Sequence, residues 1–151
     1  MLISTSKKIL EQRLKGIRPT PDDDMLSEYG LEALVYIATR TTPKTLTMDL
    51  VVEGDDYTVL RMLEDNMFIL YPDKPVYDIA SPDYSATSQL NMDEELSYAA
   101  VYYMAWLILV GNESGSRAGV ARDRFKKQVD DYITLYDSNY TRAGRETYDL
   151  M

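Results

Sequence analysis

The 151-residue chain contains no cysteine and no histidine. Without cysteine it can form no disulfide and no thiolate metal site, and it has no thiol nucleophile. Without histidine it lacks the commonest general base and the commonest metal ligand of proteins. Ser-His-Asp and Cys-His mechanisms and most zinc sites are therefore excluded. We expect a protein without catalytic residues, metal or cofactor.

The chain also lacks a long apolar run. Its longest, Tyr98 to Val110, is shorter than the roughly 20 residues that a membrane-spanning helix needs. The N-terminus, MLISTSKK, has its charges after a very short apolar start, which is the reverse of an export signal. We therefore expect a protein made in a cytoplasm, with no membrane partner.

Positive charge is scarce, and the formal net charge is -9. Residues 1–20 carry five Lys or Arg against one Glu, residues 21–116 sum to -14, and residues 117–151 sum to +1. The acidic body argues against a surface that wraps nucleic acid. The charge pattern has two interpretations, a solvated surface or electrostatic docking between copies or onto a partner.

Residues 91–111, NMDEELSYAAVYYMAWLILVG, predict the central helix of the core, 92–110. We expect Asn91 to cap its start and Gly111 to end it in a left-handed conformation. Apolar side chains occur on all sides of this helix, which is typical of a helix that is covered on more than one side.

Apolar residues at helical spacing predict three further helices. The first spans Ser4 to Gly16 and is expected to be capped by Ser4, Thr5 or Ser6. The second begins at Asp22-Asp23-Asp24, which we interpret as a helix cap and not as a cation site. The last runs from Arg117 to about Tyr136 and forms an antiparallel hairpin with the central helix, because the connecting loop is short.

Residues 45–90 have a different pattern. Alternating apolar residues predict a strand at 45–52. We expect another strand at 67–71, whereas 57–63 fits either a strand or a short helix. We favour a small ribbon, followed by a proline-containing extended connection to Asn91. The sequence thus predicts a single, mainly α domain, 1–151, with a bundle of about four helices around helix 92–110 and a small β-ribbon or extended arm in 45–90.

Three weak catalytic patterns were weighed. Gly54-Asp55-Asp56 matches only three residues of a polymerase metal turn. The segment GNESGSRAG lacks the Gly-Lys-Ser/Thr end of a phosphate-binding loop. Paired carboxylates could act as acid and base, but each candidate has a simpler explanation as a helix cap or exposed residue: Asp93, Glu94, Glu95, Asp130 and Asp131.

Tyrosine is over-represented, with 13 Tyr against two Phe. Tyrosine is enriched at protein interfaces, although a Tyr can equally lie at the rim of a core with its hydroxyl in water. We predict partner contacts for the loop and tail residues outside the helical stripes: Tyr77, Tyr84, Tyr140, Arg142, Arg145, Tyr148, Leu150 and Met151.

Residues 67–76, MFILYPDKPV, lead through a polar extended stretch to residues 90–110, LNMDEELSYAAVYYMAWLILV. This aromatic-Pro-x-x-Pro stretch, followed by an acidic cap and a Leu-x-x-Ala helix with aromatic residues, resembles the head-to-tail connector proteins of tailed bacteriophages, also called adaptor, head-completion or ring proteins. The resemblance covers roughly residues 22–140. The strands at 45–71 depart from the purely helical members.

The resemblance implies a virion structural protein, made in a bacterial host and located at the head-tail interface. About twelve copies would form a ring under the portal protein and extend the DNA channel toward the next tail component. DNA would pass without specific binding. Residues 137–151 would be the C-terminal docking tail, and residues 45–90 the tail-side or inter-subunit surface. The alternatives are a host protein-binding adaptor without catalysis and another minor virion or tail-completion protein.

Overall fold

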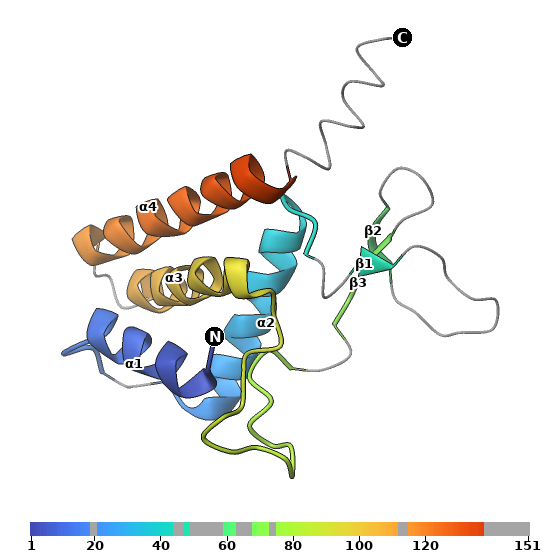
Figure 1. Cartoon of the computed structure of the whole chain (residues 1–151). Coiled ribbons are helices and arrows are strands. Elements are labelled where there is room, and N and C mark those ends of the chain that lie inside the picture. The colour runs from blue at the N-terminus through green and yellow to red at the C-terminus, as the bar shows by residue number, and fades with distance from the viewer. Residues whose placement is uncertain are drawn as a thin grey trace, which may run out of the picture.

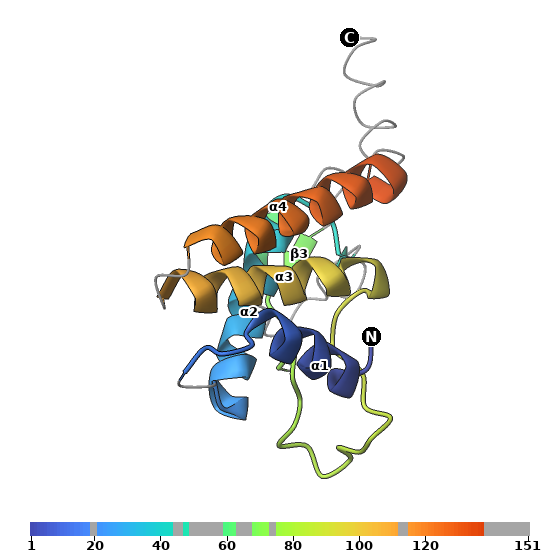
Figure 2. The same cartoon turned by 90° about the vertical axis from the view of Figure 1, so that its left-hand side faces the viewer.

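Helix α3 (Glu94–Gly111) is the centre of the fold and contacts α1 (Ile3–Arg13), α2 (Asp23–Ala38) and α4 (Gly115–Tyr132). The computed structural model describes residues 1–18, 21–43, 47–48, 59–62, 68–72, 75–111 and 115–137. Helices α1, α3 and α4 lie one above another with α3 in the middle, and α2 crosses behind them (Figures 1 and 2). The protein is mainly α, as the sequence predicts.

Burial along α3 agrees with a helix covered on several sides. Ten of its residues are buried, among them Leu96, Val101, Met104 and Leu109. The cover is not complete, because Tyr98 is 44% exposed and Val110 is 52% exposed. The apolar pattern all round the helix therefore predicts the core position correctly but overstates how much of the surface is covered.

Both ends of α3 differ from the prediction. The helix begins at Glu94, so Asp93 and not Asn91 precedes it. Asn91 lies three residues before the helix, where its backbone amide donates a hydrogen bond to the Val76 carbonyl at 3.1 Å. Gly111 is the last residue of the helix and has no positive φ, whereas Gly16, after α1, has φ of 84°.

Helix α2 begins as predicted. The Asp22 side chain accepts a hydrogen bond from the Met25 amide at 2.8 Å, which is the N-cap interaction expected of a first-turn aspartate. The cap satisfies one amide that the helix itself leaves without a partner. The aspartate run is therefore a helix start, as we interpreted it.

Helix α1 is capped by the backbone of a distant loop. It begins at Ile3, and no side chain caps it, so the predicted caps Ser4, Thr5 and Ser6 are wrong. The Ile3 amide instead donates to the Ser88 carbonyl at 2.9 Å, and Leu2 forms an isolated bridge with Gln89. These contacts tie the start of the chain to the loop that precedes α3.

Helix α4 is antiparallel to α3 and is followed by a π-helical turn, Ile133–Asp137. Its buried residues, Ala118, Ala121, Phe125, Val129 and Tyr132, lie at helical spacing. The buried stripe therefore has the helical spacing on which the prediction of this helix rests. The hairpin with α3 is the most extensive helix contact in the fold.

A small antiparallel sheet stands beside the bundle (Figure 1). It contains β1 (Thr47–Met48), β2 (Val59–Met62) and β3 (Phe68–Leu70) in the order β1-β3-β2, with Thr47 opposite Ile69 and Met62 opposite Phe68. The ribbon is confirmed, and residues 59–62 form a strand and not a helix. The predicted turns at 53–56 and 65–66 lie outside the described residues.

The connection from the sheet to α3 returns to the core and does not remain an arm. Val76, Tyr77, Leu90 and Met92 are all buried in the main cluster. Gly30 of α2 permits this approach, because a Cβ built there would lie 3.0 Å from the Tyr77 ring and 3.2 Å from Val76 Cβ. The outer part, around Asp83 and Tyr84, faces solvent.

Candidate interaction surfaces

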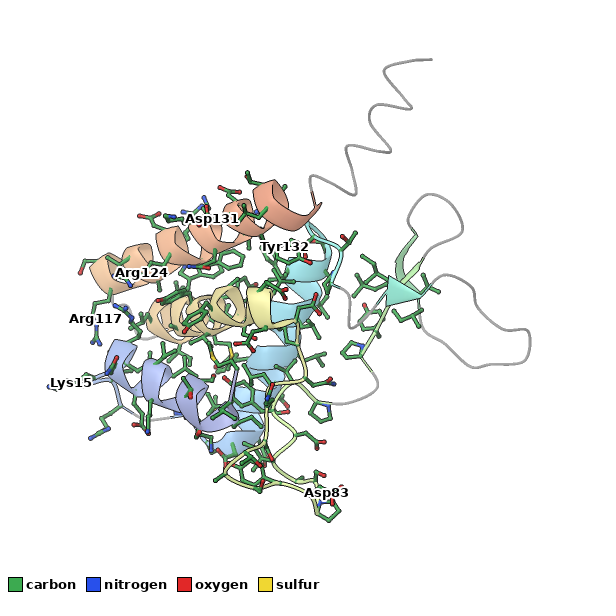
Figure 3. The ribbon with its side chains drawn as sticks, viewed as in Figure 1. Lys15, Asp83, Arg117, Arg124, Asp131 and Tyr132 are labelled. Atoms are coloured by element: carbon green, nitrogen blue, oxygen red, sulfur yellow. The ribbon has the colours of Figure 1, made fainter. Side chains whose placement is uncertain are left out.

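A group of basic residues gathers where α1 and α3 end and α4 begins. Lys15, Arg117 and Arg124 lie at this end of the bundle in Figure 3. We define the basic corner as Arg13, Lys15, Arg117 and Arg124, together with the exposed Val110 and Val120. Its position follows from topology, because the carboxyl ends of α1 and α3 point to the same end of the bundle (Figure 1). Cations are favoured near the carboxyl ends of helices.

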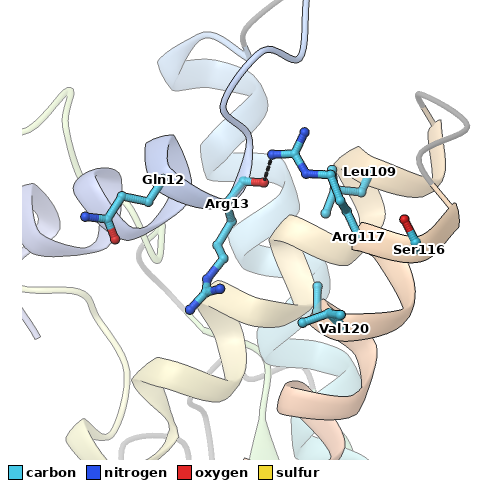
Figure 4. A pocket seen from close by; sticks show the side chains of 7 residues that line it. Gln12, Arg13, Leu109, Ser116, Arg117 and Val120 are labelled. Carbon is cyan, nitrogen blue, oxygen red and sulfur yellow. Dashed lines mark hydrogen bonds between the residues drawn. The ribbon is translucent and has the colours of Figure 1, made fainter.

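Arg117 fastens the end of α1 to α4. Its guanidinium donates to the Lys15 carbonyl at 2.9 Å and to the Arg13 carbonyl (Figure 4). The last carbonyls of a helix have no partner within the helix. Arg117 therefore acts as a side-chain cap for α1, although it lies in α4, more than a hundred positions along the chain.

The ring of Tyr102 lies between two other guanidinium groups. Arg13 Cζ is 5.6 Å from the ring centroid, and Arg124 Cζ is 5.7 Å from it. Cation–π contacts of this kind stabilise an exposed cation by about 0.5–1 kcal/mol. Among the ion pairs of the described residues, none involves Arg13, Arg117 or Arg124. The guanidinium groups contact backbone carbonyls and the Tyr102 ring. No carboxylate among the described residues pairs with them.

A cleft of about 270 Å³ opens at this corner (Figure 4). Its lining combines Gln12, Arg13, Ser116 and Arg117 with the apolar Leu109, Val120 and Ala121. Arg13 Nε is buried without a hydrogen-bond partner among the described residues. An apolar floor with a cationic rim suits a side chain that carries both a carboxylate and a hydrocarbon part.

A second cleft, of about 460 Å³, lies between α1 and the start of α2. Lys7 and Asp23 cross it with an ion pair of 2.7 Å. Lys15 of the basic corner also lines this second cleft, so the two clefts adjoin the same end of α1.

The outer side of α2 has the opposite character. We define the α2 face as its exposed residues Asp24, Met25, Glu28, Leu31 and Glu32. Positions 24, 28, 31 and 32 lie on one side of a helix because they are three or four residues apart. None of the three carboxylates takes part in an ion pair among the described residues. Figures 1 and 2 place α2 behind α3, away from the end that carries the basic corner.

Two of the five carboxylates considered as acid–base pairs form ion pairs in the structure. Glu94 accepts an ion pair from the Met1 ammonium group, and Lys127 pairs with Asp131 at 2.9 Å. The Asp93 carbonyl accepts from Ser97 Oγ at 3.0 Å. In the described part of the chain, no group of three or more acidic residues could hold a metal ion. The Gly54-Asp55-Asp56 turn lies outside that part.

The predicted partner-contact residues divide three ways. Tyr77 is wrong as a surface residue, because it is only 2% exposed and its hydroxyl contacts Ser6 Oγ. Its extended, proline-flanked segment concealed this burial, since a strand-like stretch without helical spacing gives no sign of the face that packs. Tyr84 is 39% exposed, so it remains a prediction. Tyr140, Arg142, Arg145, Tyr148, Leu150 and Met151 lie outside the described residues.

Sequence reasoning missed the basic corner and the α2 face as surfaces. The available signals were the run of basic residues at 13–18 and the acids at 24, 28 and 32, spaced by one helical turn. The pairing of α1 with α4 could not be read from either signal.

No protein-family model, curated protein or solved structure matches this chain. Of the helices that the structure describes, none is long and apolar enough to cross a membrane.

Proposed function

We propose that this protein is a virion structural subunit that forms a ring between the capsid portal and the tail of a bacteriophage. About twelve copies close around the axis and extend the DNA channel, as in the connector family that the sequence resembles. The role requires neither catalysis nor a cofactor. Its partners are further copies of the chain, the portal protein and the next tail component.

The observation that carries the proposal is the presence of surfaces of opposite charge on different faces of one chain. The basic corner lies at one end of the bundle, and the α2 face lies behind it. A subunit with two different, complementary surfaces can associate head to tail, and such contacts generate rings when the rotation closes. A protein that pairs with one foreign partner has no need of both surfaces.

The acidic composition supports a channel role. With a net charge of -9, the subunit repels the phosphate backbone at long range, so DNA can move past it without tight binding. The sheet lies at one side of the bundle (Figure 1) and joins its core through the buried Ile69. Its position at this edge suits it to contact a neighbouring component.

Electron microscopy of the purified chain, with its mass from light scattering over a range of concentrations, tests the proposal. We expect closed rings of about twelve subunits at high concentration or after addition of portal-bearing capsids. Co-sedimentation with those capsids, measured against capsids that lack the portal, is the matched control. A compact dimer that does not bind the portal-bearing capsids would overturn the proposal.

A further inference from the structure

The basic corner carries exposed apolar side chains as well as charge. Val120, which is 50% exposed, lines the cleft with Arg13 and Arg117, whose guanidinium groups have no carboxylate partner among the described residues. Val110, which is 52% exposed, is the second-last residue of α3. Helix-end charge compensation accounts for Arg13, in the last turn of α1, and for Lys15 just beyond it. It does not account for Arg124, nor for two exposed valines.

The α2 face presents the complementary set. Asp24, Glu28 and Glu32 follow one line along α2, and Met25, which is 43% exposed, and Leu31, which is 40% exposed, flank this line. The face therefore combines negative charge with exposed apolar side chains, and both kinds of group contribute to protein interfaces. Each surface has the charge that the other lacks.

We propose that the basic corner of one copy binds the α2 face of the next copy. The guanidinium and ammonium groups of the corner pair with Asp24, Glu28 and Glu32, while Val110 and Val120 pack against Met25 and Leu31. This contact rests on the proposed ring function and names the interface that builds it. The two surfaces are on different faces of the chain. Each copy can therefore bind one neighbour through its basic corner and another neighbour through its α2 face.

The far end of the α3–α4 hairpin is the competing acidic surface, but two of its carboxylates are already compensated. Glu94 pairs with the Met1 ammonium group, and Asp131 pairs with Lys127. The three carboxylates of the α2 face have no such partner among the described residues. The unpaired surface gains more from contact with a cation, so the α2 face is the preferred partner.

Site-directed cross-linking tests the contact directly, because the natural chain has no cysteine. V120C and L31C chains are mixed and treated with a short bifunctional maleimide. We expect the V120C–L31C product to exceed the V120C–V120C and L31C–L31C products by about tenfold, because the contact joins different surfaces. Since both side chains are exposed, neither substitution should disturb the core.

A third variant, L135C, is the matched control. Leu135 is 63% exposed and follows the acidic end of α4. A V120C–L135C product that equals or exceeds the V120C–L31C product would overturn the proposed contact. Absence of a V120C–L31C product above the like-with-like background would also overturn it.

A charge swap gives a second readout. E28K/E32K and K15E/R124E should each weaken self-association by about tenfold or more, and a mixture of the two variants should recover cross-chain binding. K126E, an exposed reversal on α4, should leave association unchanged. Failure of the mixture to recover binding argues against pairing of these two surfaces.

The results separate the contact from the ring. Closed rings with cross-links at other positions refute the contact and leave the proposed function intact. A V120C–L31C product that joins open chains without closure supports the contact and removes the ring.

Discussion

Tyr77 is the residue whose environment is most unusual. It lies 2% exposed between α1 and α2, with its hydroxyl against Ser6 Oγ, and burial raises its pKa from 10.0 to about 12. A buried tyrosine resists ionisation because the charged form loses its water. The stability of the fold should therefore depend on the ionisation of Tyr77 at alkaline pH.

We predict that Y77F is less stable than the natural chain by about 1 kcal/mol at pH 7, because a buried hydroxyl contact is lost. Between pH 10 and about 12 the unfolded chain releases the Tyr77 proton while the folded chain keeps it. The free energy of unfolding of the natural chain therefore falls as pH rises through this interval. The variant lacks this loss, so the difference between the two proteins shrinks.

Urea unfolding at pH 7 to 11 measures this effect. Y84F is the control, because Tyr84 is exposed and should show no change. A stability difference for Y77F that stays constant up to pH 11 would contradict the burial of the hydroxyl.

Gly30 of α2 allows Val76 and Tyr77 to pack closely against the helix. An added methyl group would gain about 1 kcal/mol of helix propensity, yet it would lie 3.0 Å from Tyr77 Cδ2 and 3.2 Å from Val76 Cβ. Both neighbours are buried and cannot move freely. We predict that G30A destabilises the protein by about 1–2 kcal/mol overall.

The control is G119A in α4, where no atom lies within 4 Å of the added carbon. That variant should be stabilised by up to about 1 kcal/mol. Thermal unfolding of both variants decides the matter, since stabilisation of G30A to the same extent would show that the 76–77 segment is not closely packed on α2.

At the scale of elements, α1 depends on contacts with distant segments at both ends. Its first amide donates to the Ser88 carbonyl, and its last carbonyls accept from Arg117. A helix of 11 residues is marginal in isolation. Its order therefore comes from α3, α4 and the loop before α3.

We predict that R117A frays the last turn of α1 and lowers the stability of the protein by about 1 kcal/mol. Hydrogen exchange should become faster at Leu10 to Leu14, while α2 remains protected. R122A removes an exposed arginine of the same helix and serves as the control. Equal exchange rates in R117A and R122A would rule out the capping role.

At the scale of the whole molecule, the bundle is built around α3 and carries its charge unevenly. Aromatic contacts bind the helices together, with Tyr103 of α3 stacked on Tyr36 of α2 at 5.0 Å and edge-on to Phe125 of α4 at 5.0 Å. The core thus joins the helices to Ile69 of β3 and to Val76 and Tyr77 of the connecting segment, and the surfaces proposed for assembly lie outside it.

We predict that deletion of residues 137–151 leaves this core folded but abolishes incorporation into particles. The prediction rests on the position of the tail after the last buried residue of α4, Tyr132, and on its apolar residues Tyr148, Leu150 and Met151. Circular dichroism checks the fold, and immunoblotting of purified particles checks incorporation. Normal incorporation of the truncated chain would refute the docking role of the tail.

The sequence by itself determined the helices, the ribbon and the identity of the central element. These depend on residues close by in the sequence: apolar spacing in α4, the Asp22 cap of α2, and alternation around β1. Local hydrogen bonds and periodicity depend on residues that are close in the sequence, so they can be predicted without knowledge of the tertiary structure.

Only the tertiary structure decided where α1 and α3 begin, that Tyr77 is buried, and that a basic corner exists. The backbone of Asn91 bonds to Val76 ahead of the helix, and the corner unites residues of α1, α3 and α4. These features arise from contacts between segments far apart in the chain. Such contacts depend on which helix faces pack together, and that choice is made by the whole core at once.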